Sequence, residues 1–209
     1  MRIVAIIVCI STSSYASKTQ KAFDALKIYD YFKAKTLFYQ DLKKNTASAS
    51  FGLAIIYSRN DNPFSNADSA TKYIHLGYNS YSLKKIPQSF SGFTVDSSTF
   101  IKLCDSVALK IFEKIKKTNS VNAIETFITN NYLANSNIIS EAILKRDELE
   151  FNDVLSRNVS DSTLLFIKQH PQSNYRAEAQ ILFDRQLFEE LTRNNLAQEY
   201  ISFVKKYPS

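Results

Sequence analysis

Three segments of the chain repeat one spacing of residues, and this repeat constrains the fold more than any other feature. In each segment two phenylalanines stand 15 residues apart, an aliphatic residue follows the first at +3, and an asparagine follows it at +7. Successive copies are offset by 37 to 39 residues, a period typical of arrays of helical hairpins. The phenylalanine pairs are Phe112/Phe127, Phe151/Phe166 and Phe188/Phe203, and the asparagines are Asn119, Asn158 and Asn195.

Each repeated position has a physical role in a helical hairpin. The first phenylalanine and the aliphatic residue at +3 share one face of a first helix. The asparagine stands where that helix must end, and it either adopts left-handed backbone geometry or caps the next helix. The second phenylalanine lies on the inner face of a second helix, which Pro171 or Pro208 ends. Because one hairpin cannot bury its apolar face alone, residues 100–209 are predicted to form three stacked hairpins.

The composition supports an all-α fold. The chain of 209 residues has only 3 glycines and 4 prolines, so tight turns that need positive φ must be few. This disfavours a sheet-rich fold built on glycine turns. It favours helices joined by short loops rich in asparagine and serine.

Residues 17–78 are predicted to form two further helical hairpins. Small and aromatic residues recur there at fixed offsets: Ala22, Ala34 and Phe38 in one unit, and Ala54, Tyr57, Ala70, Ile74 and Gly77 in the next. In this pattern the chain resembles the tetratricopeptide repeat, moderately in these two units and loosely in the three later ones. The resemblance implies an α-solenoid of about five stacked antiparallel hairpins. The chain departs from the family in two ways: 13 residues separate Tyr57 from Ala70 where the family has nine, and the closing proline is absent from both early units.

The phrase "FIKQHPQSNYRAEA" at residues 166–179 is similar to a phrase of bacterial envelope proteins, among them tetratricopeptide proteins of outer-membrane assembly. This resemblance implies a location in the bacterial cell envelope.

Residues 79–99 interrupt the helical pattern and are predicted to be a long non-helical connection. The segment contains Pro87, Gly92, several serines, and Phe90 and Phe93, with Asp96 or Ser97 capping the next helix. Long ordered loops often carry function, so the connection is either a functional element or a linker whose phenylalanines pack on the helices.

Residues 1–16 are predicted to be a secretory signal peptide. Arg2 precedes an apolar run from Ile3 to Ile10, and small residues stand before the cleavage expected after Ala16. A buried N-terminal element is the alternative, and the residues before Cys9 do not fit a lipoprotein signal. The apolar run is too short to span a bilayer, so the mature chain is predicted to be exported, without a transmembrane segment, to the periplasm or the outer membrane.

No pattern in the sequence indicates a catalytic, cofactor or metal site. His75 and His170 lie in different units without metal-ligand spacing, and Cys104, the one cysteine outside the signal peptide, is expected to be a buried inert thiol. The carboxylates Asp147, Glu148, Glu150, Glu189 and Glu190 are interpreted as a solvated helix face. The net charge of +6 comes from scattered lysines, without a basic cluster of the kind that binds nucleic acid.

The function predicted from these features is a non-catalytic scaffold that binds protein partners in the cell envelope through a helical-repeat groove. Two alternatives stay open: an assembly or targeting module of a longer envelope protein, and a small-molecule binder or enzyme with residues 79–99 as a lid. The oligomeric state does not follow from the sequence. The residues expected to contact a partner are Tyr29, Tyr57, Arg59, Phe90 and Phe93.

Overall fold

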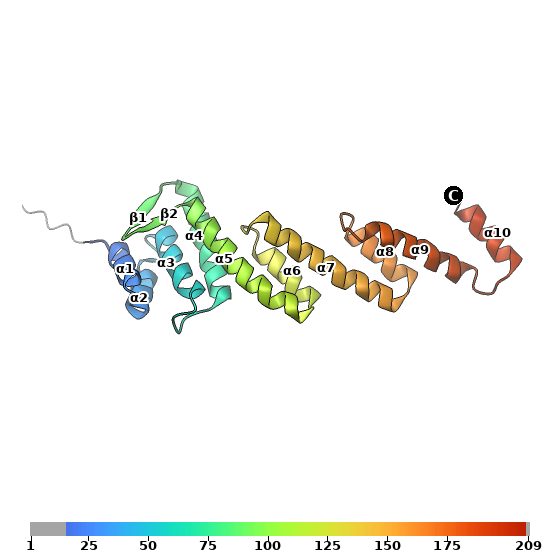
Figure 1. Ribbon diagram of the computed structural model, residues 1–209. Coiled ribbons are helices and arrows are strands. Elements are labelled where there is room, and N and C mark those ends of the chain that lie inside the picture. The colour runs from blue at the N-terminus through green and yellow to red at the C-terminus, as the bar shows by residue number, and fades with distance from the viewer. Residues whose placement is uncertain (1–15, 208–209) are drawn as a thin grey trace, which may run out of the picture. The chain divides into compact units, whose positions relative to one another are not determined.

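The computed structural model describes residues 16–207, so the predicted signal peptide lies outside the described residues except for Ala16. The described part is mostly helical, with ten α-helices and one short hairpin, which confirms the prediction of an all-α chain (Figure 1). The described residues divide into two compact units, with the boundary between Leu103 and Cys104. Each unit is described by itself below.

The first unit contains four helices, a two-stranded hairpin and the start of a fifth helix. The elements are α1 (Lys18–Lys27), α2 (Tyr31–Asp41), α3 (Thr46–Ser58), α4 (Ala67–Lys84), β1 (Gln88–Phe90), β2 (Phe93–Val95) and α5 (Ser97–Ile115), which continues into the second unit. Helix α1 packs on α2, α2 on α3, and α3 on α4. Small side chains at buried positions allow these helices to approach one another closely.

The small residues of the first unit are buried as their spacing predicts. Ala22, Ala34 and Phe38 are fully buried. The ring of Phe38 lies directly over Gly52 of α3, so close that a Cβ atom on Gly52 would stand 2.1 Å from the nearest ring carbon. Gly77 of α4 has the same role beneath Phe100 of α5, where a Cβ atom would stand 2.5 Å from the ring. The absence of a side chain at these two positions thus sets the helix spacing.

The predicted non-helical connection at residues 79–99 is shorter than expected, which corrects that prediction. Helix α4 continues to Lys84, since Tyr81 is buried and extends its inner face, and α5 already begins at Ser97. Lys85 ends α4 in the left-handed conformation, with φ of 51°. Between the helices, β1 and β2 pair antiparallel with Phe90 opposite Phe93. Asp96 caps α5 as predicted, because its carboxylate accepts a hydrogen bond of 2.8 Å from the Thr99 amide.

The second unit is formed by the rest of α5 and five further helices. After a short 3₁₀ turn at Lys116–Thr118 come α6 (Val121–Asn130), α7 (Ser136–Arg157), α8 (Ser160–Gln169), α9 (Arg176–Leu191) and α10 (Ala197–Lys206). Helix α6 packs on α7, α7 on α8, α8 on α9, and α9 on α10. Helix α8 ends at Gln169, before Pro171, as the proline predicts, whereas Pro208 lies outside the described residues.

Each phenylalanine pair of the sequence pattern makes a ring contact. The ring centroids are 5.4 Å apart in Phe112/Phe127, 5.6 Å in Phe151/Phe166 and 5.2 Å in Phe188/Phe203. All three asparagines adopt left-handed backbone geometry, with φ of 49° at Asn119, 50° at Asn158 and 58° at Asn195. Of the two roles predicted for these asparagines, the structure therefore shows the left-handed geometry, directly after α7 at Asn158, after the 3₁₀ turn at Asn119, and four residues beyond α9 at Asn195.

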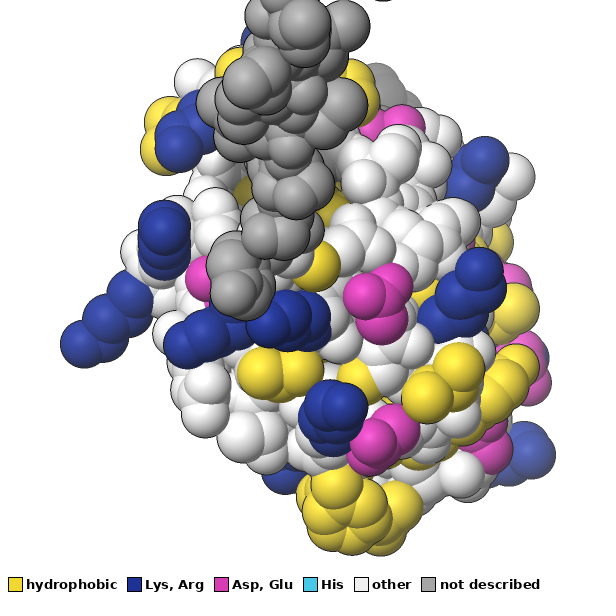
Figure 2. Space-filling model, turned by 90° about the vertical axis from the view of Figure 1, so that its left-hand side faces the viewer, with side chains coloured by type: hydrophobic (Ala, Val, Ile, Leu, Met, Phe, Trp, Pro, Cys, Tyr) yellow, Lys and Arg dark blue, Asp and Glu magenta, His cyan; other side chains and the backbone are white. Residues whose placement is uncertain are grey.

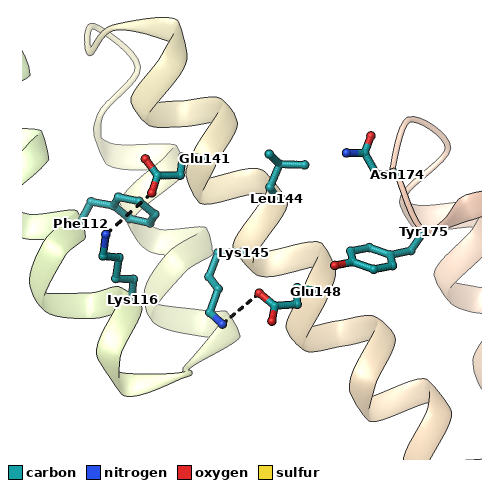
Figure 3. Close-up of a pocket in the computed structure, with 8 residues that line it drawn as sticks. All are labelled: Phe112, Lys116, Glu141, Leu144, Lys145, Glu148, Asn174 and Tyr175. Carbon is teal, nitrogen blue, oxygen red and sulfur yellow. Dashed lines mark hydrogen bonds and ion pairs between the residues drawn. The ribbon is translucent and has the colours of Figure 1, made fainter.

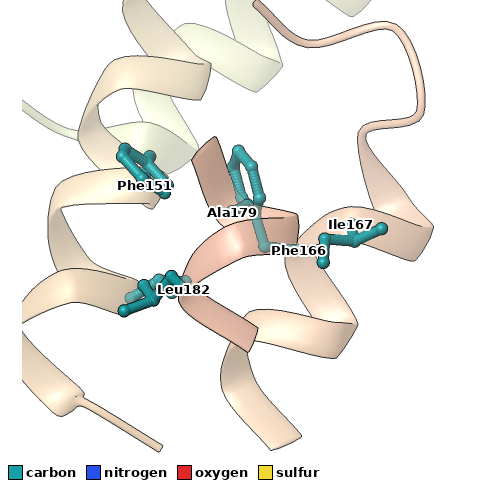
Figure 4. Close-up of a cluster of buried hydrophobic side chains, with 6 residues drawn as sticks. Phe151, Phe166, Ile167, Ala179 and Leu182 are labelled. Atoms are coloured by element: carbon teal, nitrogen blue, oxygen red, sulfur yellow. The ribbon is translucent and has the colours of Figure 1, made fainter. Parts of the chain in front are cut away.

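The first two pairs are buried, and the third is more exposed. Phe151 and Phe166 form a core with Ile167 and with Ala179 and Leu182 of α9 (Figure 4). Phe112 and Phe127 are covered in the same way by α7, which contributes Ala142. Phe188 is 40% exposed, and α10 has no buried residue. Within the second unit, apolar packing is thus weakest between α9 and α10.

Candidate functional site

Tyr29 and Arg59, two of the residues predicted to contact a partner, lie together in the first unit. Tyr29 forms the turn between α1 and α2 with φ of 63°, and Arg59 follows the end of α3. The guanidinium carbon is 5.4 Å from the centroid of the Tyr29 ring, within the range of a cation–π contact. Arg59 Nη1 also donates a hydrogen bond of 3.1 Å to the hydroxyl of Tyr31, which donates to Asp61. These contacts hold the guanidinium in one place beside the turn.

Exposed apolar side chains stand near Tyr29 in the chain. Ile28 is 73% exposed, Tyr29 63% and Phe32 67%, and the ring of Phe32 meets that of Phe64 at 4.8 Å. Lys35 lies over the Phe64 ring at 3.8 Å. We call Ile28, Tyr29, Phe32, Arg59 and Phe64 the turn patch. On the face of the first unit in Figure 2, apolar side chains are exposed among lysine, arginine and carboxylate side chains.

Tyr57 belongs to a hydroxyl network beside the turn patch. Its hydroxyl is 2.8 Å from that of Tyr39, and Tyr73 donates to Tyr39 at 3.0 Å. The rings of Tyr57 and Tyr73 are stacked with centroids 5.6 Å apart. Burial, together with hydrogen bonds to the other two hydroxyls, raises the pKa of Tyr39 well above its usual range. Tyr57 is therefore a packing residue that holds α2 against α3 and α4.

Phe90 and Phe93 contact a different part of the first unit. Both rings pack on the buried Phe23 of α1, with centroids 5.0 Å and 5.4 Å away. Hydrogen bonds hold the hairpin at both ends: Ser91 donates to Asp24, and Ser48 donates to Gln88. Of the two roles predicted for these phenylalanines, the contacts match packing on the helices. The structure thus joins Tyr29 to Arg59 and places the other three predicted residues in packing contacts.

An open cavity of about 590 Å³ lies in the second unit (Figure 3). Phe112 and Leu144 line one side, and Asn174 and Tyr175 line the other. The charges at its edge are paired across short distances, with Lys116 3.8 Å from Glu141 and Lys145 3.0 Å from Glu148. Because each charge already has a partner, the cavity offers little uncompensated charge to a ligand.

The interpretation of Asp147 and Glu150 as part of a solvated face is wrong. The Asp147 side chain is 3% exposed and the His170 side chain 9%. His170 Nδ1 is 3.6 Å from Asp147 Oδ1, and its Nε2 is 2.5 Å from Glu150 Oε2. The sequence held a signal for this placement, since Asp147 stands four residues before Phe151 and so shares its inward face. Glu189 and Glu190 are exposed as predicted.

The remaining reactive side chains fit structural roles. Cys104 is buried as expected, and burial, with the Asp105 carboxylate nearby, raises the pKa of its thiol from 9.0 to about 11. Burial lowers the pKa of the half-buried His75. A high-pKa thiol is a poor nucleophile at neutral pH, so Cys104 is not suited to nucleophilic catalysis.

Comparison of the chain with protein-family models, with curated proteins and with solved structures finds no match. Within residues 16–207, none of the helices combines the length and the apolarity needed to cross a bilayer.

Proposed function

We propose that the chain is a non-catalytic scaffold that binds a protein partner through the turn patch of its first unit. The observation that carries this proposal is the exposure of Ile28, Tyr29 and Phe32 beside an immobilised Arg59. Tyrosine, phenylalanine and arginine are enriched in the centres of protein interfaces. Contiguous exposed apolar side chains bordered by polar groups are typical of surfaces that bind other proteins.

The turn patch is held in place before any partner binds. The Tyr39, Tyr57 and Tyr73 hydroxyl network and the contact of Phe38 with Gly52 fix the three helices beneath it. A preorganised surface loses little side-chain freedom on binding, so more of the contact energy contributes to affinity. The anchored hairpin of Phe90 and Phe93 supports this reading over that of a lid, because its rings are already packed on α1.

The proposal includes the wider setting expected from the sequence. The chain would be exported to the bacterial cell envelope, and its hairpins would stack in the manner of a tetratricopeptide-like solenoid. The ring contacts of the three phenylalanine pairs and the left-handed asparagines are consistent with such stacking. The partner would present apolar side chains to Tyr29 and Phe32 and acceptor groups to Arg59.

Affinity capture from envelope extracts tests the proposal with two matched double variants. The test variant carries Tyr29→Asn and Phe32→Ser; asparagine suits the left-handed backbone at position 29, so folding should be retained. The control variant carries Leu83→Ser and Ile86→Ser, which also removes two exposed apolar side chains of the first unit. A protein retained by the wild type and the control but lost by the test variant is expected. Equal capture by all three, or capture of no specific protein, would contradict the proposal.

A further inference from the structure

Three potential metal ligands converge in the second unit, apart from the turn patch. Asp147 and Glu150 stand one helical turn apart on α7, and His170 follows the end of α8. One donor atom from each residue lies within 4.8 Å of the others. Among the described residues, this is the one group of three or more histidine, cysteine or carboxylate side chains that meets this condition.

The three side chains are held in place by the packing of α7 against α8. The His170 ring contacts that of Phe166 with centroids 5.1 Å apart, and its backbone amide donates to the Phe166 carbonyl. Arg146 donates to Asp147 Oδ1 through Nε at 3.0 Å and Nη2 at 2.6 Å. Donors to a ligating carboxylate orient it, so Arg146 is a positioning residue for Asp147.

The cluster carries an excess of negative charge. The carboxylate of Glu150 interacts electrostatically with those of Asp147 and Glu125, and Arg146 is the permanently charged cation beside them. His170 adds positive charge only when its ring is protonated. Arg146 offsets one of these negative charges, and a bound cation would offset the remainder.

Glu150 and His170 also border open space. A cavity of about 140 Å³ is lined by both residues together with Asp153, Phe166 and Gln169. Oε2 of Glu150 is buried without a hydrogen-bond donor, because its 2.5 Å contact with His170 Nε2 does not have the geometry of a hydrogen bond. An ion entering from the cavity would meet this unpaired oxygen beside the Nε2 atom of His170.

We propose that Asp147, Glu150 and His170 bind one divalent transition-metal ion, with solvent completing the coordination from the adjacent cavity. One imidazole and two carboxylates suit zinc and its neighbours in the first transition row better than calcium or magnesium, which prefer oxygen ligands alone. Binding would join α7 to the end of α8 and neutralise the buried carboxylates.

Isothermal titration of the purified, tag-free protein with Zn²⁺ tests this site. We expect one ion per chain, and an affinity at least about tenfold lower in Glu150→Gln and in His170→Gln, since each removes a ligand. The control is Glu148→Gln, which makes the same change of charge on α7 at a residue paired with Lys145 rather than His170. The control should bind as the wild type does.

A second measurement keeps the test decisive where a variant folds poorly. Co²⁺ added to the wild type and to Glu150→Gln should give visible absorption bands that differ between the two, while circular dichroism reports helix content. The proposal is overturned if the wild type binds no zinc saturably at about 100 µM. It is equally overturned if folded Glu150→Gln and Glu148→Gln bind zinc with the same affinity.

Discussion

Replacing Gly52 with alanine tests the packing that supports the turn patch. The new methyl group would stand 2.1, 2.3 and 2.5 Å from three carbons of the Phe38 ring, far inside van der Waals contact. Phe38 is fully buried and its ring also meets Phe23 at 4.9 Å, so it cannot rotate away freely. Either α2 and α3 must separate or the ring must leave its rotamer.

The size of the effect follows from two opposing terms. Alanine in an open helix position would stabilise the fold by about 1 kcal/mol relative to glycine. Overpacking a core typically costs about 1–3 kcal/mol and occasionally more. Contacts this short place Gly52→Ala at the upper end of that range, so we expect a net loss of about 2 kcal/mol. For a unit of this size the melting temperature should fall by roughly 10 °C.

Urea unfolding followed by circular dichroism measures the loss, and a double-mutant cycle assigns its cause. In a Phe38→Leu background the ring is absent, so Gly52→Ala should cost at least about 1 kcal/mol less than in the wild type. An equal cost in both backgrounds would show that Phe38 is not what excludes a side chain at position 52. A gain in stability from Gly52→Ala in the wild type would refute the packing of α2 on α3 outright.

Three further predictions concern single residues. Asn119→Ala should lower the unfolding free energy by about 1 kcal/mol in urea titrations because φ is 49° there, whereas Asn119→Gly should not; equal effects would contradict the left-handed geometry. In a Cys9→Ser background, Cys104 should react with a thiol reagent at pH 8 roughly 100-fold more slowly when folded than in urea, since its pKa is raised from 9.0 to about 11; equal rates would contradict its burial. Because the pKa of His75 is lowered in the folded chain, protonation of His75 favours the unfolded state. The free energy of unfolding should therefore fall as the pH drops below 6.5. His75→Gln should reduce that fall, as measured by urea unfolding from pH 5 to 8, and an unchanged slope would exclude His75 as a cause.

The sequence was sufficient to predict the structure at positions where a single residue type determines the local backbone geometry or helix spacing. The repeated asparagines predicted left-handed backbone at Asn119, Asn158 and Asn195, because asparagine tolerates that geometry better than most residues, and all three adopt it. Only α7 ends directly before its asparagine, since α5 ends at Ile115 and α9 at Leu191. The small residues at Ala22 and Ala34 likewise predicted close helix contacts.

The sequence could not reveal contacts between distant segments. The hairpin of β1 and β2 has strands of three residues each, too short for an alternating pattern to stand out. Its phenylalanines are fixed by Phe23, which lies more than 60 residues earlier in the chain. His170 meets Glu150 only because α8 folds back along α7. The spacing of Asp147 from Phe151 indicated an inward face for Asp147, but nothing local indicated that His170 would meet it.

The most direct test of the central claim is site-specific photocrosslinking at the turn patch. A photoreactive phenylalanine analogue placed at Phe32, and separately at Leu83 as a matched exposed position, would be activated in envelope extracts and the adducts identified by mass spectrometry. If the turn patch binds a partner, one protein should crosslink at position 32 and not at position 83. That adduct should be lost when Tyr29→Asn is also present. Crosslinks of the same proteins from both positions, or none from position 32, would contradict the claim that the turn patch binds a partner.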